Sequence, residues 1–496
     1  MRPQSVDAYS LWGTSDQEPL FGHVAHDVWW RPVLSRHRFE GMRRQALRGD
    51  HSRVDGFRSN PQSMAREPFI TKALPHGTGG SDIIWIMFDI QGARLQLQIL
   101  DEIRSGRANT RPNVVRVTGL GRSLVNQRLD ELIELDLIHE GDVVAVPRGR
   151  SPRAITFYGN KAQILCADIG ATGLFVGLAD LAGQMHESVY IPHDVSAGPE
   201  ATLTIVEREF NRIVASRSAL SLNVWGIGIG LPGPVEFGSG WPVTPPIMPS
   251  WSLYNVRDRL QRKYNVPVWV DNDTNLMAIG ELRAGAARGA QDAILFKIST
   301  GVGAALISRG EIHRGAQGAA GDVGHVQLND FAEFVCRCGK GGCLEAVAGG
   351  WALARQAETA AAEDGEGFLT RVGQEPEFSM SQVIQGYLAE DPTCMRLVNR
   401  SARLVGEAVA QYINFFNPTM VLLGGRLLMA GNSYLAAVRT VVYERSLPLA
   451  TRDLIVTSTE LGDLAALYGA GHMAIDEIFR PKYFATWTPS GAPTII

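Results

Sequence analysis

The chain contains the stretch Cys336-Arg337-Cys338-Gly339-Lys340-Gly341-Gly342-Cys343-Leu344-Glu345, and His325 lies a short way before it. Three thiolates and one imidazole complete the tetrahedral coordination that Zn2+ prefers, and the glycines between them let the chain turn tightly around the ion. Such a ligand set leaves no coordination position for water. The stretch therefore predicts a structural zinc site rather than a catalytic one, with these ligands: His325, Cys336, Cys338 and Cys343.

The alternative is that these cysteines are unrelated buried thiols. The other two of the chain's 5 cysteines, Cys166 and Cys394, argue against it, because they show how sparse cysteine is elsewhere. Asp322 on one side of the stretch and Glu345 on the other are polar groups suited to a sugar. A knuckle of this kind would hold both in place.

Composition limits the possible classes of protein. The chain has 496 residues, 45% of them hydrophobic and 20% charged, which describes an ordinary globular protein of two or three domains. A net charge of −4 means that any contact with DNA must come from a local basic patch. Clustered cysteines fit a reducing compartment, and we find neither an apolar run of membrane-spanning length nor a signal-peptide pattern. We expect a cytoplasmic protein without a membrane partner.

Residues 1–87 precede the first segment with a clear pattern. Most of this region is rich in Arg, His, Pro, Ser and Gly, and no apolar periodicity persists beyond a few residues. We expect a disordered extension or a start site assigned too early, since Met87 comes immediately before the patterned segment.

Residues 88–158 have the pattern of a winged helix-turn-helix domain. After a first helical pattern, a short segment at 113–118 is followed by a glycine-containing break at 119–121 and then by a longer helix with Val125, Leu129 and Leu132 on one face. A short helix, a tight turn and a second helix are the helix-turn-helix layout. Residues 140–146 then read as a hairpin, which ends in the basic tip 147–153.

Polar and basic side chains lie on the face of the second helix opposite its apolar residues, and further arginines occupy the basic tip. These side-chain types bond base edges and phosphates. We expect contacts with operator DNA from Arg122, Ser123, Asn126, Gln127, Arg128, Arg148, Arg150 and Arg153. The alternative is a small module that contacts only proteins and whose arginines are merely solvated. The order of helix, turn, helix and basic wing favours DNA.

The remainder of the chain, from about 162 to 478, alternates strands and helices. A strand at 162–169 runs into the turn Gly170-Ala171-Thr172-Gly173 and a second strand. Backbone N–H groups freed by small residues can cradle phosphate, and Asp168 is placed to hold Mg2+ through water. The pattern repeats near 296–308, so we expect two similar lobes around a nucleotide. The candidate ATP-binding residues are Asp168, Gly170, Thr172, Thr300, Gly301, Gly303, Gly424 and Gly425.

From about 95 to 475 the chain resembles the ROK family of repressors and sugar kinases. The most specific matches are the cysteine stretch with Glu345 and the block Ala320-Gly321-Asp322-Val323-Gly324-His325. Weaker matches are Asp168-Ile169-Gly170-Ala171-Thr172, Leu231-Pro232-Gly233-Pro234-Val235 and Asp271-Asn272-Asp273-Thr274-Asn275. The winged helix is similar to that of the family's transcriptional regulators.

The resemblance implies an α/β fold: a winged helix-turn-helix domain followed by a two-lobe, actin-like or hexokinase-like body with a zinc knuckle. It places the N-terminal lobe at 162–283, completed by a helix at about 463–479, and the C-terminal lobe with the zinc site at 284–462.

The resemblance also implies roles for residues of the cleft. Asp273 would act as general base on a sugar hydroxyl if the chain is a kinase, and Asn272 would bond a neighbouring hydroxyl. Asp322, His325 and Glu345 correspond to the remaining sugar contacts, and His325 would give one ring nitrogen to zinc and the other to the sugar. Without the resemblance, 271–273 would read as a simple turn after a strand.

Two departures from the family's kinases weaken the case for ATP. Asp322 stands where those kinases usually have Glu, and the first turn carries Ala171 and no following lysine. A methyl group crowds the approach of phosphate, and the missing lysine removes a positive charge.

We therefore interpret the chain as a sugar-responsive transcriptional regulator, a repressor of carbohydrate metabolism that binds operator DNA as a homodimer or larger assembly. The alternative is an ATP-dependent, glucokinase-like sugar kinase that carries a DNA-binding domain, and a third possibility is a sugar-binding scaffold with neither activity. Structural Zn2+ is expected in every case, and Mg2+ and ATP only for a kinase.

Overall fold

The computed structural model describes residues 80–144, 151–217, 223–363, 368–372 and 378–495. All of them belong to one compact unit, Pro75–Ile496. The extension expected at the N-terminus lies outside the described residues up to position 79. Among the described residues, no helix is both long enough and apolar enough to cross a membrane.

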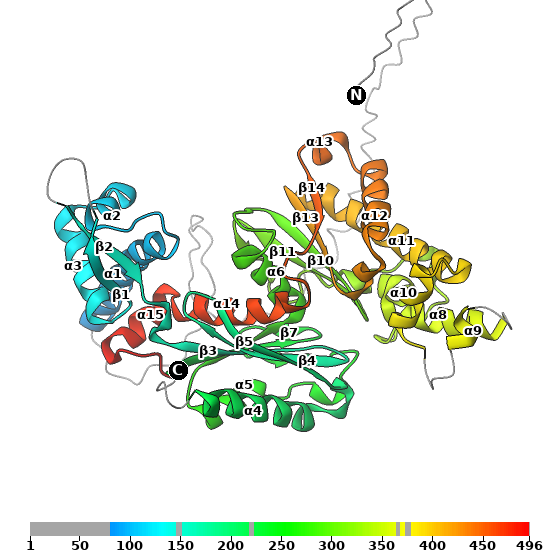
Figure 1. The fold of residues 1–496 in the computed structure, drawn as a ribbon, viewed down its shortest axis with the longest axis horizontal. Helices are drawn as coiled ribbons and strands as arrows, with labels where there is room; N and C mark the ends of the chain where they lie inside the picture. The colour runs from blue at the N-terminus through cyan, green and yellow to red at the C-terminus, as the bar shows by residue number, and fades with distance from the viewer. Residues whose placement is uncertain (1–79, 145–150, 218–222, 364–367, 373–377, 496) are drawn as a thin grey trace, which may run out of the picture. The chain divides into compact units, whose positions relative to one another are not determined.

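The described chain begins with three helices and a two-stranded ribbon (Figure 1). The bounds are α1 (Gly80–Arg104), α2 (Arg111–Thr118), α3 (Arg122–Glu134), β1 (Ile138–Val143) and β2 (Arg153–Phe157). Thr110 caps α2 by accepting a hydrogen bond from the Asn113 N–H, and Gly119 ends it at φ 67, a conformation that suits glycine. The apolar residues that the helical spacing singles out, Val125, Leu129 and Leu132, are buried together with α1.

The ribbon differs from the hairpin expected at 140–146. β1 pairs antiparallel with β2, so the second strand comes only after the basic segment. Pro152, directly before β2, fits this late start of the second strand, because proline has no N–H to donate to a strand ladder. The middle of the connection between β1 and β2, 145–150, lies outside the described residues.

The first α/β lobe is built on a five-stranded sheet with the order β5-β4-β3-β6-β9. Its strands are β3 (Gln163–Ile169), β4 (Gly173–Asp180), β5 (Met185–Pro192), β6 (Val224–Leu231) and β9 (Val268–Asn272). Helices α4 (Pro199–Ser216) and α5 (Val256–Tyr264) cover one face, while α6 (Asp273–Ala284) and α14 (Ala465–Ile478) pack on the other (Figure 1). The short strands β7 (Val235–Glu236) and β8 (Trp241–Pro242) pair beside the sheet.

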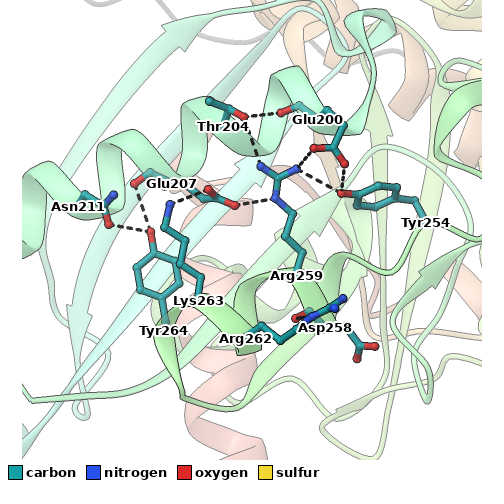
Figure 2. Close-up of polar contacts among 10 residues, drawn as sticks. All are labelled: Glu200, Thr204, Glu207, Asn211, Tyr254, Asp258, Arg259, Arg262, Lys263 and Tyr264. Atoms are coloured by element: carbon teal, nitrogen blue, oxygen red, sulfur yellow. Dashed lines mark hydrogen bonds and ion pairs between the residues drawn. The ribbon is translucent and has the colours of Figure 1, made fainter.

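A polar network joins α4 to α5 on the outside of this lobe (Figure 2). The Arg259 guanidinium donates to Glu200 and to Glu207, each at 2.6 Å, and Lys263 donates to Glu207 at the same distance. Isolated surface ion pairs contribute little to stability, but a shared arginine in a network loses its side-chain freedom only once. The network therefore orients α5, which lies against β9 just before the cleft residues.

The second lobe repeats the design of the first. Its sheet has the order β12-β11-β10-β13-β14, in which three antiparallel strands are extended by two parallel strands, as in the first lobe. The strands are β10 (Ala293–Ile298), β11 (Val302–Ser308), β12 (Glu311–Ile312), β13 (Met420–Gly424) and β14 (Ile455–Ser458). The helices are α7 (Leu344–Ala348), α8 (Gly350–Glu363), α9 (Phe368–Val372), α10 (Met380–Leu388), α11 (Pro392–Phe416), α12 (Asn432–Arg445) and α13 (Pro448–Thr451). This repetition agrees with the two similar lobes expected from the glycine turns.

Helices α6 and α14 cross at very short range. A Cβ added at Gly280 would lie 2.1 Å from the Ala465 carbonyl oxygen, and one added at Gly469 would lie 1.8 Å from the Leu276 carbonyl oxygen. Only glycine permits so close a crossing, which fixes the N-terminus of α6 relative to α14.

The C-terminal segment, to which the sequence assigns no role, continues into α15 (Pro481–Trp487), which packs against α1. Trp487 is fully buried, with its ring 5.1 Å from that of Trp225 and 5.0 Å from that of Phe484. One buried cluster therefore includes residues of α1, α14 and α15.

Candidate functional site

A cavity is lined by the carboxyl ends of strands from both sheets. Five of its lining residues are the predicted sugar contacts: Asn272, Asp273, Asp322, His325 and Glu345. It is also lined by most of the predicted nucleotide residues, namely Asp168, Gly170, Thr172, Thr300, Gly301, Gly303 and Gly425. Gly424 is the exception: it ends β13 and is not among the lining residues. The structure thus brings together side chains that lie far apart in the sequence.

The side chain of Asn272 forms hydrogen bonds with backbone groups. Asn272 ends β9 and caps α6: its Oδ1 accepts hydrogen bonds from the N–H groups of Thr274 (2.9 Å) and Asn275 (3.2 Å). Its amide nitrogen donates to the Gly233 carbonyl at 2.9 Å. The capping interaction fixes where the next residue, Asp273, points. One N–H of Asn272 remains for a ligand.

The Asp273 carboxylate is held by two neighbours. Lys297 Nζ lies 2.6 Å from Oδ2, and the Thr274 hydroxyl donates to Oδ1 at 3.1 Å. Burial alone would lower the pKa of Lys297, but the carboxylates of Asp273 and Asp168 outweigh it and the pKa lies above its usual value. The Lys297 ammonium is therefore a permanent charge of the cavity. Sequence reasoning missed it, because a single lysine in an otherwise apolar strand carries no motif.

Asp168 stands at the end of β3 with its Oδ1 buried and without a hydrogen-bond partner among the described residues. Burial raises the pKa of Asp168 to about 7, an effect that Lys297 opposes and that Asp273 and Asp463 reinforce. A carboxylate oxygen of this kind is satisfied by a proton or by a hydrated cation. Its chemistry therefore fits the expected Mg2+, which it would bind through water.

Both glycine turns face the cavity. A Cβ at Gly301 would lie 2.2 Å from the Glu345 carboxylate, so only glycine leaves room for that side chain. In the first turn, Arg426 Nη1 donates to the Thr172 hydroxyl at 3.5 Å. Arg426 comes from the second lobe, directly after Gly425, and supplies a positive charge near the turn that lacks a lysine.

The four predicted zinc ligands form a cluster whose ligand atoms all lie within 4.8 Å of one another. Cys336 Sγ is 3.6 Å from His325 Nδ1, and Cys338 Sγ is 3.6 Å from Cys343 Sγ. Bond lengths of about 2.3 Å to sulfur and about 2.0 Å to nitrogen, in tetrahedral geometry, require separations of this size. Gly339 and Gly342 have φ values of 86 and 74 and make the turn between the cysteines. The cluster fits a zinc ion.

His325 and Glu345 connect this cluster to the cavity. The Nδ1 atom of His325 faces Cys336, while Nε2 lies 3.9 Å from the Asp322 carboxylate. Glu345 follows the last cysteine; its Oε2 accepts from the Val302 N–H at 3.1 Å and its Oε1 from Arg337 at 3.2 Å. Arg337, which also lines the cavity, was not singled out by the sequence.

The candidate DNA-binding residues divide into two groups. Arg122, Ser123 and Gln127 are exposed on α3, Asn126 is half-buried beside Arg111, and Arg153 is exposed at the start of β2. Arg148 and Arg150 lie outside the described residues.

The expectation for Arg128 is wrong, because this residue does not lie on the exposed face of α3 with Arg122, Ser123 and Gln127. It pairs with Glu131 at 2.6 Å and packs against Gly92 of α1, where a Cβ would lie 3.6 Å from its guanidinium. Its position explains this, because Arg128 is three residues after Val125 and four before Leu132, on their side of the helix.

Comparison with known proteins agrees with this architecture. A xylose repressor of Caldicellulosiruptor bescii is 28% identical over 389 residues, which cover 78% of this chain and 97% of the repressor. The crystal structure of a ROK family transcriptional regulator, a homologue of the Escherichia coli MLC protein, covers 82% of this chain and 100% of its own, with a TM-score of 0.69 at 24% identity. At that identity it shows the shared fold alone.

A ROK family glucokinase from Streptomyces griseus, solved in complex with glucose and AMPPNP, is 27% identical. It covers 64% of this chain and 100% of its own, with a TM-score of 0.54. The fold of the body is thus the two-lobe, actin-like fold of ROK sugar kinases. The family pattern itself matches residues 164–477, which is more than half of the sequence, and the chain therefore belongs to the ROK family.

Proposed function

We propose that this chain is a sugar-responsive transcriptional repressor that binds operator DNA and takes a sugar into the kinase-like cleft. The observation that carries the proposal is the joining, in one compact unit, of α2, the Gly119 turn and α3 to a ROK body. The xylose repressor matches this chain over 78% of its length, whereas the glucokinase covers only 64%.

DNA binding is supported by the geometry of residues 88–158, which we interpret as a winged helix-turn-helix domain. The exposed side chains of Arg122, Ser123 and Gln127 lie on α3, the second helix of the motif, and Arg153 lies at the end of the ribbon next to the connection between its strands. A second helix of this kind enters the major groove, and a basic wing contacts the backbone or the minor groove. We expect a dimer, because repressors that read two half-sites match the two-fold symmetry of the operator.

Sugar binding is supported by the carboxylates and the imidazole that converge in the cavity. Asp273, Asp322 and Glu345 offer acceptors, and His325 and Asn272 offer nitrogen atoms. Zinc at the adjacent cluster would be structural, because four protein ligands leave it no open position. It would fix His325 and, through the short link to α7, Glu345.

Sugar phosphorylation is the second candidate, and one observation favours it. Asp168 and both glycine turns face the same cavity as Asp273, which is the arrangement that phosphoryl transfer with Mg2+ and ATP needs. Asp322 and Ala171 still separate this chain from the usual kinase pattern.

The test begins with selection of bound duplexes from a pool of genomic fragments by the full-length, zinc-loaded protein. The affinity for a selected duplex is then measured by fluorescence anisotropy with and without each of a panel of hexoses, pentoses and N-acetylated sugars. We expect one class of sugar to weaken DNA binding by 5- to 150-fold, which corresponds to about 1–3 kcal/mol of coupling.

The same panel with ATP and Mg2+, followed by ADP release, distinguishes the two candidates. Sugar-dependent turnover that disappears in Asp273→Asn, with operator affinity unchanged by every sugar, would establish the kinase instead.

A further inference from the structure

We propose that Lys297 is a positioning residue that turns the Asp273 carboxylate into a fixed hydrogen-bond acceptor for the sugar and removes its capacity to act as a general base. The proposal rests on the proposed function in one respect, namely that the cleft binds a sugar. It adds a reason why this cleft would hold a sugar without phosphorylating it.

The strand register gives Lys297 its place. On β10 it lies opposite Gly303 of β11 and opposite Gly424 of β13, so no neighbouring side chain flanks it on either strand. Directly opposite residues of a sheet project to the same face. Two glycines that the sequence assigns to nucleotide turns therefore also clear the path by which the lysine side chain reaches α6.

The contacts show what the ammonium does there. It lies 2.6 Å from Asp273 Oδ2, while the Thr274 hydroxyl holds Oδ1 at 3.1 Å. Both carboxylate oxygens thus have a fixed donor. Two further carboxyl groups face the ion pair of Lys297 and Asp273. They are Asp168 from β3 and Asp463 from the turn before α14. Among the described salt bridges, Asp273 is the only partner of Lys297.

The consequence follows from what a general base must do. It has to end the step as a neutral acid, and here that would leave a buried ammonium without the carboxylate with which it forms its ion pair. An adjacent cation stabilises the charged form of a carboxylate and makes it a weaker base. Each carboxylate oxygen retains a further lone pair, so the group still accepts a hydrogen bond from a sugar hydroxyl. Binding is kept while proton abstraction is disfavoured.

The experiment is a double-mutant cycle with Lys297→Met, Asp273→Asn and the double variant, in the full-length zinc-loaded protein. Dissociation constants for D-xylose and D-glucose are measured by calorimetry, with zinc content and melting temperature as checks of folding. We expect each single substitution to weaken the binding of the cognate sugar at least 10-fold. The double variant should recover at least 10-fold relative to the product of the single effects, because a neutral amide beside a thioether leaves no unpaired charge.

A pH series adds a readout that a merely structural lysine would not change. Removal of the ammonium leaves the Asp273 carboxylate buried without its cation, so Lys297→Met should lose sugar affinity as the pH falls from 8 to about 5.5. Because the charge of Asp273 influences the titration of Asp168, both profiles are measured in an Asp168→Asn background, where the difference between Lys297→Met and the double variant isolates Asp273. Identical profiles for these two proteins would overturn the proposal, as would additive effects in the cycle.

The third measurement is sugar-dependent ADP release by the wild-type protein. Sugar-dependent ADP release in the presence of Mg2+ and ATP that is lost in Asp273→Asn would show that the carboxylate acts as a base despite Lys297, and would refute the inference. If instead no sugar changes operator affinity while the cycle shows coupling, the repressor proposal fails and the assignment of Lys297 stands. Failure of every sugar to bind would refute both.

Discussion

At the scale of single residues, Asp168 has the most testable electrostatics of the cleft. Its pKa is raised by burial from a usual 3.8 to about 7, so the folded protein holds a proton that the unfolded chain has lost. Stability from this group is complete below about pH 4 and decreases as the pH rises to about 7. The total loss is about 4 kcal/mol, at about 1.4 kcal/mol for each pH unit.

Asp168→Asn should remove this dependence. We expect the substitution to raise the melting temperature clearly at pH 8 and by about a third as much at pH 5, because at pH 5 only the first part of the loss between about pH 4 and pH 7 has occurred. Scanning fluorimetry of ligand-free protein without Mg2+ at both values measures the effect. Equal shifts at the two pH values would contradict the titration of Asp168.

The cysteine cluster allows a prediction with a matched control. Cys338→Ser should reduce bound zinc and weaken sugar binding together, because the metal holds the knuckle that carries His325 and Glu345. Cys394→Ser is the control, since Cys394 is buried on α11, away from the cluster. Zinc is measured by mass spectrometry and sugar affinity by calorimetry. Full zinc occupancy in Cys338→Ser, or equal loss in the control, would be inconsistent with this site.

At the scale of elements, α3 presents two kinds of arginine. Arg122 is exposed near its N-terminus, whereas Arg128 is packed against α1 and paired with Glu131. Arg122→Ala should weaken operator binding by about 1–3 kcal/mol if it reads a base, without a change of melting temperature. Arg128→Ala should instead lower the melting temperature, because it leaves Glu131 without its cation and exposes the contact with α1.

Anisotropy and thermal melts of both variants measure these effects. Loss of operator affinity in Arg128→Ala, at a temperature where the protein remains folded, would reinstate Arg128 as a DNA contact.

The same element shows how far the sequence determines the structure. The periodicity of Val125, Leu129 and Leu132 predicted α3 and its buried face correctly, since apolar residues at helical spacing have one way to be buried. The same spacing puts Arg128 on the buried side of α3. Sequence reasoning nevertheless treats a charged side chain as exposed unless a partner for it is known. The partner and the Gly92 contact come from packing against α1, which no local pattern contains.

The cleft shows the same difference between local sequence patterns and contacts made by packing. Glycine turns and the cysteine stretch are local patterns, and the structure brings their residues together as expected. Lys297 and Arg426 act on residues of distant elements, so their roles depend on how the strands and lobes are arranged. The part of the site that depends on tertiary contact is the part that sequence reasoning missed.

At the scale of the whole molecule, a repressor needs a physical connection from the sugar to α3. The cleft residues Asn272 and Asp273 start α6, which crosses α14 at the glycine contacts. The chain then continues from α14 into α15, and α15 packs against α1 and so reaches the buried face of α3. A shift at the start of α6 would therefore reach α3, the helix that we propose to bind DNA, through packed elements, which transmit displacement because protein cores are dense.

Trp487 is the residue to test on this route, because its ring fills the space between α15 and Trp225 and its Nε1 donates to the Ile478 carbonyl at 2.9 Å. Trp487→Ala should cost about 3–5 kcal/mol of stability. At a temperature where it is folded, we expect sugar affinity to be kept within about twofold and the effect of sugar on operator affinity to fall toward none.

Trp251→Ala is the matched control. Trp251 is equally buried, but it lies in the separate core between the first sheet and α4 and α5. The control should lose a similar amount of stability and keep the coupling between sugar and operator. If both variants reduce the coupling equally, general loosening of the fold rather than α15 carries the signal. If neither does, the sugar acts on DNA binding by a route other than this helix.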